Sequence, residues 1–142
     1  MRLAAIDLGS NSFRLEIARV EDGNIFSECN WKETVRLAAG LDEDGYLSEA
    51  AQKRALTALS RIAEKLQGFP PSQVRAVGTQ TLRAAENSAE FLVKAEKVLG
   101  YKIEILRGKE EARLVYMGCS FALPASDEIR LIVDIGGAST EC

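Results

Sequence analysis

Residues 3–12 read LAAIDLGSNS, and a second stretch near the other end of the chain, residues 129–140, reads IRLIVDIGGAST. Each begins as a run of aliphatic residues and continues with an acid, an aliphatic, a glycine and small polar residues. Aliphatic runs of this length are typical of buried strands. Because the ligands of α/β proteins collect at the carboxyl ends of strands, the two stretches predict an α/β fold with two ligand-binding turns.

The composition of these turns predicts phosphate-binding loops. Successive backbone amides in such a turn form a concave anion site, and glycine lets a ligand approach the main chain. An ordinary β-turn explains one such turn well, whereas two matching turns favour ligand binding. Asp7 and Asp134 could hold a hard cation, usually Mg²⁺. The predicted loop residues are Gly9, Ser10, Asn11 and Ser12 in the first turn, and Gly136, Gly137, Ala138, Ser139 and Thr140 in the second.

The rest of the chain reads as strands and helices in an order typical of α/β proteins. DGN at 22–24 predicts a tight turn between two strands, and Ser48 is a predicted helix N-cap. The pattern therefore predicts a mixed sheet with flanking helices. The predicted strands cover 2–7, 13–20, 25–33, 74–79, 102–106 and 129–135, and the predicted helices run from 48 to about 66, from 87 or 88 to 100, and from about 109 to 122. The first two helices have apolar stripes at Ala55, Leu59, Ile62 and Leu66, and at Phe91, Ala95 and Val98.

Composition excludes several classes of protein. The chain has 142 residues, 46% of them apolar, which suits one domain with a real core. The formal net charge is −3 and no basic block occurs, so neither nucleic acid nor a membrane surface is an expected partner. No apolar run approaches the roughly 20 residues that cross a bilayer.

Cysteine and histidine usage points to a reducing compartment and to carboxylate chemistry. The three cysteines are widely spaced, and no CxxC is present, which fits a cytoplasmic protein better than a disulfide framework or a zinc site. Histidine is absent from the sequence, which excludes a His-based triad, general base or metal ligand within this chain. Acid–base chemistry would therefore fall mainly to Asp and Glu.

The sequence GKEEAR at 108–113 supplies a candidate base. At 100° per residue, Glu111 shares a helix face with Leu114 and Val115, and with Gly118 further along. The helix dipole explains Glu110, but it does not require an acid on the inward face. A general base that aligns water on a phosphate fits Glu111. Arg83 could contact an anion, although a solvated surface role is equally compatible with the sequence. Arg14 and Arg113 are expected to have structural or ion-pairing roles.

Four stretches together resemble the exopolyphosphatase / guanosine pentaphosphate phosphatase family, which belongs to the superfamily of actin, Hsp70 and sugar kinases. They are AIDLGSNSFRL at 5–15, VGTQTLRAA at 77–85, GKEEAR at 108–113 and DIGGASTE at 134–141. They occur in the family's order over essentially the whole chain. The paired loop motifs with GxEEAR are highly specific, whereas DxG alone is not.

The resemblance implies a ribonuclease H-like, actin-like ATPase domain with a mixed five-stranded sheet over residues 1–142. It implies an N-terminal domain of a longer protein whose second domain is absent here, with little activity expected from the fragment. It also implies Mg²⁺-dependent removal of a terminal phosphate from polyphosphate or guanosine pentaphosphate, and it leaves room for a homodimer of the full-length protein.

The resemblance also implies roles for individual residues. Glu111 matches the family's catalytic glutamate, which activates water, and Asp134 and Glu141 match its metal- and water-positioning acids. Ala138 stands where the family usually has a third glycine, and alanine fits that loop if its φ is negative. The choice between the two substrates stays open. Two alternatives remain: an ATP-dependent kinase of the same superfamily, and a non-catalytic phosphate or nucleotide sensor.

Overall fold

The computed structural model describes residues 1–142 and contains a mixed five-stranded sheet in the order β3-β2-β1-β4-β5. β1 pairs antiparallel with β2 and parallel with β4; β2–β3 is antiparallel and β4–β5 parallel. The predicted mixed five-stranded sheet with flanking helices is therefore confirmed. The strands are β1 (Arg2–Leu8), β2 (Ser12–Glu21), β3 (Asn24–Thr34), β4 (Val74–Gly78) and β5 (Ile103–Ile105).

The predicted tight turn between β2 and β3 is present. Asp22 has φ 49° and Gly23 has φ 77°. Positive φ at both central positions matches the twist of an antiparallel pair, and Asp-Gly is a preferred sequence for it. Local turn chemistry thus sets the register of the hairpin at the edge of the sheet.

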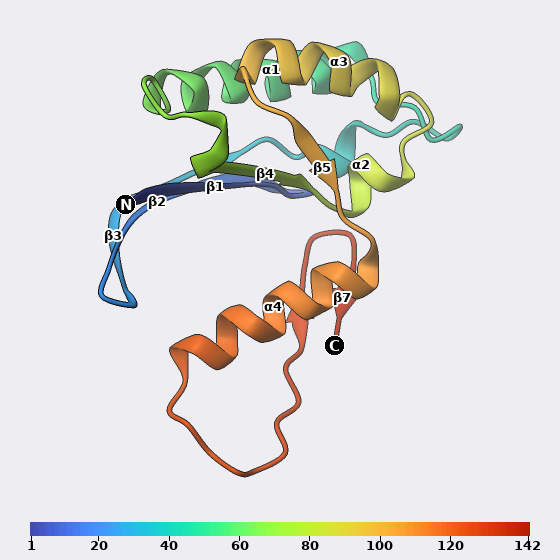
Figure 1. The fold of residues 1–142 in the computed structure, drawn as a ribbon. Helices are drawn as coiled ribbons and strands as arrows, with labels where there is room; N and C mark the ends of the chain where they lie inside the picture. Colours follow the sequence, from blue (N-terminus) through green and yellow to red (C-terminus); the bar gives the residue numbers. More distant parts are fainter.

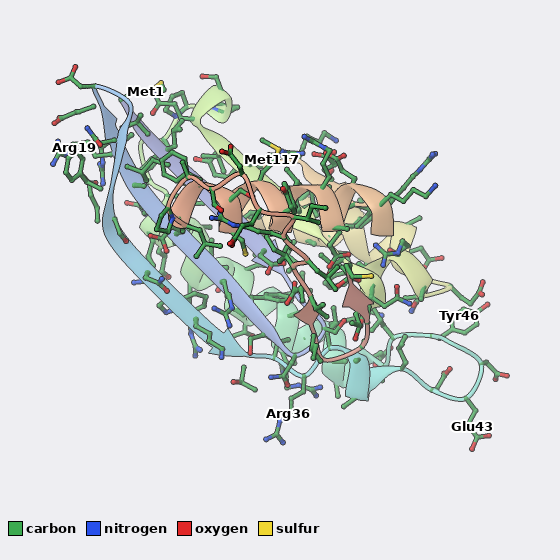
Figure 2. The ribbon with its side chains drawn as sticks, turned by 90° about the horizontal axis from the view of Figure 1, so that it is seen from below. Met1, Arg19, Arg36, Glu43, Tyr46 and Met117 are labelled. Carbon is green, nitrogen blue, oxygen red and sulfur yellow. The ribbon has the colours of Figure 1, made fainter.

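Helices cover both faces of the sheet unequally (Figure 1). α1 and α3 lie side by side over one face, and α4 crosses the other; Figure 2 shows α4 from below, in front of the strands. None of the helices is long and apolar enough to span a membrane. The helices are α1 (Glu49–Lys65), α2 (Gln80–Ala84), α3 (Ser88–Leu99) and α4 (Gly108–Ala122), with 3₁₀ turns at Ala38–Gly40 and Pro71–Gln73. α2 was not predicted.

The core lies between the sheet and the α1–α3 layer. The predicted α1 stripe is buried along its whole length, and Ser48 caps α1 by accepting a hydrogen bond from the Ala51 amide. In α3 the prediction is wrong at one position, because Val98 is exposed and Leu99 is buried in its place. Leu99 lies four residues after Ala95, which lies four residues after Phe91; residues spaced by four lie on the same face of a helix, so Leu99 continues the stripe of Phe91 and Ala95.

The predicted strand at 129–135 is wrong over most of its length. Only Asp134–Ile135 (β6) is a strand, and it pairs with Thr140–Glu141 (β7) in a separate two-stranded sheet. The apolar residues before it, among them Leu131 and Val133, are exposed. A strand needs a hydrogen-bonding neighbour as well as a suitable sequence, and residues 129–133 have none here.

A pair of phenylalanines tests where the core lies. We expect Phe13→Ala to lower the free energy of unfolding by about 3–5 kcal/mol, because its ring is fully buried. Phe121→Ala is the matched control: its ring is 67% exposed on α4, so we expect a change below about 0.5 kcal/mol. Urea unfolding followed by circular dichroism measures both, and equal losses would contradict the placement of the core.

Candidate active site

A polar cleft of about 690 Å³ opens where the ends of β1 and β4 meet the start of α4 and the β6–β7 hairpin. All the residues predicted for the site line this cleft except Arg83 and Thr140. The fold therefore brings the two predicted loops and Glu111 to one place. The predicted lining residues are Asp7, Gly9, Ser10, Asn11, Ser12, Glu111, Asp134, Gly136, Gly137, Ala138, Ser139 and Glu141.

The two loops have the same backbone construction. In the first, the amide of Gly9 donates to the carbonyl of Ser12 at 3.1 Å, and in the second the amide of Gly136 donates to the carbonyl of Ser139 at 2.9 Å. Each loop thus closes a short hairpin in which the chain reverses within four residues. The sequence similarity between the two stretches corresponds to a real structural repeat.

The strands that flank the loops repeat as well. Asp7 lies within β1, opposite Arg14 on β2, and Asp134 lies opposite Glu141 in the second hairpin. Both acids therefore belong to strands and do not follow them. Thr140 lies beside Glu141 on the second strand of this hairpin, but it does not line the cleft.

Close approach explains the loop glycines better than unusual backbone angles. None of them has positive φ, and neither has Ala138, so alanine fits its position in the second loop. A Cβ at Gly9 would lie 2.7 Å from the Ser12 carbonyl oxygen, which is too close. A Cβ at Gly137 would lie 3.2 Å from the Cβ of Asn11, so the two loops almost touch.

Contacts behind the first loop hold it in place. The Thr81 hydroxyl donates to the Ser10 hydroxyl at 2.7 Å in a buried contact. The carbonyl of Ser10 accepts from the Ala38 amide, and the carbonyl of Asn11 accepts from the Val35 amide. These two carbonyl oxygens point at the 35–38 segment, which does not line the cleft. They therefore do not repel an anion bound in the cleft.

Glu111 is held by Arg83. Its side chain is only 12% exposed, and its Oε2 atom lies 3.2 Å from the Arg83 guanidinium. Arg83 also donates to the carbonyl of Leu106 and to the side-chain oxygen of Gln80. These three contacts occupy the guanidinium of Arg83, and Arg83 does not line the cleft. Arg83 can therefore orient the carboxylate of Glu111 without contacting a ligand in the cleft.

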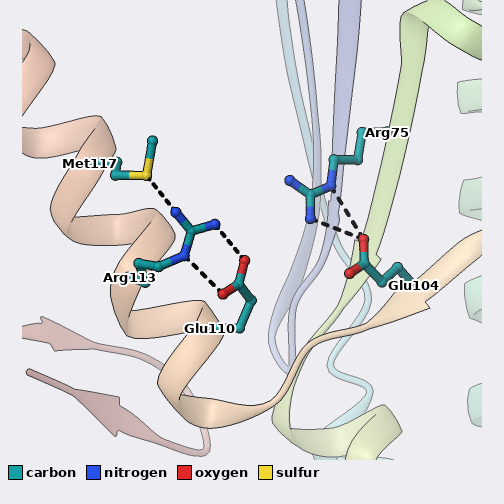
Figure 3. Close-up of polar contacts among 5 residues, drawn as sticks. All are labelled: Arg75, Glu104, Glu110, Arg113 and Met117. Carbon is teal, nitrogen blue, oxygen red and sulfur yellow. Dashed lines mark hydrogen bonds and ion pairs between the residues drawn. The ribbon is translucent and has the colours of Figure 1, made fainter.

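The neighbouring acid has a different role. Glu110 accepts two hydrogen bonds from Arg113, at 2.9 and 2.7 Å, and Arg113 also contacts the sulfur of Met117 (Figure 3). The hydrogen bonds from Arg113 hold the pKa of Glu110 below its usual value. The expected ion-pairing role of Arg113 is confirmed, and of the two adjacent acids only Glu111 lines the cleft.

The surroundings of Glu111 suit a base. Desolvation raises the pKa of Glu111 above its ordinary value, the hydrogen bond from Arg83 opposes this, and the charges of Glu141 and Asp7 add to the rise. A carboxylate with a raised pKa takes up a proton more readily than an exposed one. Gly118, which was predicted to share the inward face of α4 with Glu111, is exposed.

Asp7 is the second acid with a raised pKa. Desolvation is the main cause, the charge of Arg14 opposes it, and the charge of Asp134 adds to the rise. No group of three or more acidic or cysteine side chains is close enough to hold a metal ion by itself, so Glu141 does not complete a three-carboxylate cage. Mg²⁺ commonly uses one or two carboxylates with waters and phosphate oxygens, and the Asp7–Asp134 pair suits that arrangement.

Sequence reasoning missed three polar residues of the cleft: Arg14, Lys32 and Thr79. Arg14 was expected to be structural or ion-paired, yet its side chain forms no ion pair. The signal for Arg14 was the alternation of β2, which places it on the face opposite the buried Phe13 and Leu15. Thr79 directly follows β4, so the end-of-strand rule that led to the two loops applies to it as well.

A stability measurement tests whether the surroundings of Asp7 disfavour its ionised form. Because the folded state raises its pKa, the ionised form of Asp7 is disfavoured in the fold, and this cost grows as pH rises through the pKa. We expect Asp7→Asn to raise Tm at pH 7, and we expect the difference to shrink near pH 3, where the carboxyl is largely protonated.

The control is Asp44→Asn, an exposed acid in the 42–46 loop, for which we expect no comparable gain in Tm. Thermal melts followed by circular dichroism at the two pH values measure both variants. A lower Tm for Asp7→Asn at pH 7 would contradict this account of the site.

Several solved structures of exopolyphosphatases and PPX-GPPA enzymes are similar to this chain. An exopolyphosphatase from Cytophaga hutchinsonii matches with 31% identity and a TM-score of 0.91, over 99% of this chain and 45% of its own. The PPX-GPPA enzyme of Aquifex aeolicus matches with 32% identity and a TM-score of 0.88, over 99% of this chain and 46% of its own. The chain thus spans slightly less than half the length of these relatives.

The family model described as "Ppx/GppA phosphatase family" matches residues 16–142, which is most of the chain. An exopolyphosphatase-like protein of known structure also matches, with 34% identity and a TM-score of 0.88, over 98% of this chain and 43% of its own. Sequence and structure agree along nearly the whole length, and the actin-like fold agrees with both. The chain belongs to the Ppx/GppA phosphatase family.

Proposed function

We propose that this chain supplies one side of the active site of a hydrolase that removes the terminal phosphate from a phosphoanhydride chain. The substrates proposed are inorganic polyphosphate and guanosine pentaphosphate. The observation that carries the proposal is the position of Glu111: a shielded carboxylate with a raised pKa lines the same cleft as two glycine–serine loops. Membership of a phosphatase family supports the same chemistry.

The loops would bind the terminal phosphate group. The hydrogen-bond donors would be uncharged groups: the backbone amides of the two loops, Gly9–Ser12 and Gly136–Ser139, and the hydroxyl groups of Ser12 and Ser139. Ser10 contributes chiefly through its backbone, because its hydroxyl contacts Thr81. Phosphoryl transfer depends mostly on positioning and on electrostatic stabilisation, which fixed amides provide.

Glu111 would orient a water molecule and accept its proton as the water oxygen attacks the terminal phosphorus. The bond between that phosphorus and the bridging oxygen breaks, and the bridging oxygen leaves with the shortened chain. The products are orthophosphate and a chain with one phosphate fewer. Arg83 would keep the carboxylate aimed at the water. Its role in this proposal is to position Glu111, in place of the direct phosphate contact predicted from the sequence.

We propose Mg²⁺ as the cofactor, held by Asp7 and Asp134, with Glu141 positioned near Glu111. When bound, Mg²⁺ would offset the negative charge of the phosphate oxygens. The carboxylates of the cleft repel an anionic substrate, so a cation bound between them and the phosphate would favour substrate binding. We also retain cytoplasmic localisation, and a homodimer of the full-length protein, as proposals.

Replacement of the proposed base tests the function directly. In the complete native protein with Mg²⁺, we expect Glu111→Gln to reduce phosphate release by about 10²- to 10⁴-fold, the range typical of a lost general base. Glu110→Gln is the matched control, because its carboxylate pairs with Arg113 outside the cleft, and we expect less than about three-fold change. Long-chain polyphosphate and guanosine pentaphosphate are assayed side by side.

Near-normal turnover by a folded Glu111→Gln protein would disprove the assignment of the base. No phosphate release by the unchanged protein from either substrate would overturn the hydrolase proposal. Transfer of radiolabelled phosphate to an acceptor other than water would favour the kinase, and tight binding without turnover would favour the sensor.

The pH dependence tests the role of Arg83. Its hydrogen bond lowers the pKa of Glu111, so Arg83→Gln raises that pKa further. We expect the acid limb of the pH–rate profile to move to higher pH, because a base must be deprotonated to act. Arg83→Lys should recover part of the shift.

Arg113→Gln provides the control for this measurement, because Arg113 lies on α4, as Glu111 does, but pairs with Glu110. Its acid limb should match that of the unchanged protein. If Arg83→Gln raises KM while the acid limb stays in place, Arg83 contacts the substrate and does not act through Glu111.

A further inference from the structure

The short helix α2 contacts both the first phosphate loop and the proposed base. It follows β4 at the end of the sheet and spans the five residues Gln80–Ala84 (Figure 1). The hydroxyl of Thr81 donates a hydrogen bond to the hydroxyl of Ser10 in the loop at 2.7 Å. Arg83, two residues later, lies 3.2 Å from the carboxylate of Glu111. One short helix thus connects two parts of the cleft that are far apart in the sequence.

The helix is firmly attached to the core. Leu82 is 1% exposed, and its carbonyl accepts a hydrogen bond from the Ser88 hydroxyl at the start of α3. A Cβ on Gly78, the last residue of β4, would lie 2.8 Å from a methyl carbon of Leu82, so α2 packs directly against the end of the strand. The side-chain oxygen of Gln80 accepts a hydrogen bond from Arg83. Because α2 cannot shift without disturbing this packing, it can serve as a rigid spacer.

The contact between Thr81 and Ser10 is shielded from water. Thr81 is 2% exposed and Ser10 is 7% exposed. A buried hydroxyl that loses its partner is costly, so each of the two side chains holds the other in place. The carbonyl of Ser10 is held separately by the Ala38 amide. Ser10 is therefore fixed through its side chain and through its backbone, and the amides of the first loop keep a set position.

The two phosphate loops differ in how they are placed relative to Glu111. The second loop belongs to the β6–β7 hairpin, which packs against α4, and α4 carries Glu111 itself. The first loop belongs to the five-stranded sheet, so its distance from Glu111 depends on a link between the sheet and α4. The contacts of Thr81 and Arg83 make α2 such a link.

We propose that Thr81 is a positioning residue, which holds the first phosphate loop, through Ser10, at a fixed distance from Glu111. This inference rests on the proposed function. A terminal phosphate bound by the loop amides would then meet the water beside Glu111 at the distance and in the direction that attack requires. Thr81 does not line the cleft, so it acts through the loop and touches neither substrate nor water. A misplacement of the reacting groups by about 1 Å is enough to cost about a hundred-fold in rate.

The test removes the Thr81 hydroxyl in the complete native protein with Mg²⁺. Thr81→Val keeps the shape of the side chain, and we expect kcat for phosphate release from long-chain polyphosphate to fall by about 10- to 100-fold. Thr81→Ser keeps the hydroxyl and should recover kcat to within about three-fold. Ser10→Ala removes the other side of the contact, and it tests the same link if Thr81→Val does not fold. The double variant should be no slower than the slower single variant, because both changes remove one contact.

Ser88→Ala controls for a general loosening of α2. Ser88 donates to the carbonyl of Leu82 on the same helix but has no contact with the phosphate loop. We expect a lower Tm for Ser88→Ala and a change in kcat of less than about three-fold. The positioning role would be overturned by an equal loss of kcat in Ser88→Ala, by additive losses in the double variant, or by a lack of recovery in Thr81→Ser.

The Glu111→Gln background tests alignment with the base. If Thr81 aligns the phosphate with Glu111, Thr81→Val should slow the Glu111→Gln protein by less than about three-fold, because residues that act as a unit are not additive. A further 10- to 100-fold loss in that background would show that Thr81 acts independently of the base, against the proposal.

A binding measurement separates this inference from the proposed function. Calorimetric titration of tripolyphosphate into the Glu111→Gln protein, with and without Thr81→Val, reports the state of the loop without turnover. If the unchanged protein releases no phosphate but Thr81→Val weakens binding about ten-fold, the hydrolase proposal fails and the hold of Thr81 on the loop stands. If phosphate is released and Thr81→Val slows it no more than Ser88→Ala does, the positioning role fails and the hydrolase stands.

Discussion

The shielded ion pair between Arg83 and Glu111 connects the two parts of the site. Arg83 belongs to α2, directly after β4, and Glu111 belongs to α4, directly after β5. α4 has no fully buried residue, so side-chain packing alone does not fix its position. Arg83 contacts the carbonyl of Leu106 as well as Glu111, and it therefore fixes the start of α4 against the end of the sheet. Loss of either partner would leave the other charge poorly compensated in a shielded place.

The carboxylates of the site cost the folded protein stability. Asp7 and Glu111 both have raised pKa values, each through desolvation and through the charge of another acid in the cleft. Elsewhere on the surface, several acids pair with an arginine, as Glu104 does with Arg75 (Figure 3). A cluster of acids whose ionised forms are disfavoured by the fold is typical of a functional site. The exposed apolar residues of the 129–135 segment have another cause: no neighbouring strand covers them.

Much of this arrangement could be predicted from local patterns. The Asp22–Gly23 turn, the α1 stripe and the two loops each depend on neighbouring residues only, and all are present. The short α2 helix was missed because its few residues carry no periodic signal. The strand at 129–135 was overpredicted for the opposite reason: its local signal is strong, and only the lack of a pairing partner prevents it from forming.

Local sequence patterns specify the parts of the site: two loops in which a glycine follows two residues after an aspartate, an acid in the first turn of a helix, and the α/β order that brings the loops to one edge of a sheet. These follow from periodicity and turn chemistry, which act over a few residues. The contacts of Arg83 and Arg14, by contrast, depend on how the chain folds. A long flexible cation can reach many partners, and which partner it meets depends on distant strands and helices: Arg83 meets Glu111, whereas Arg14 remains unpaired in the cleft.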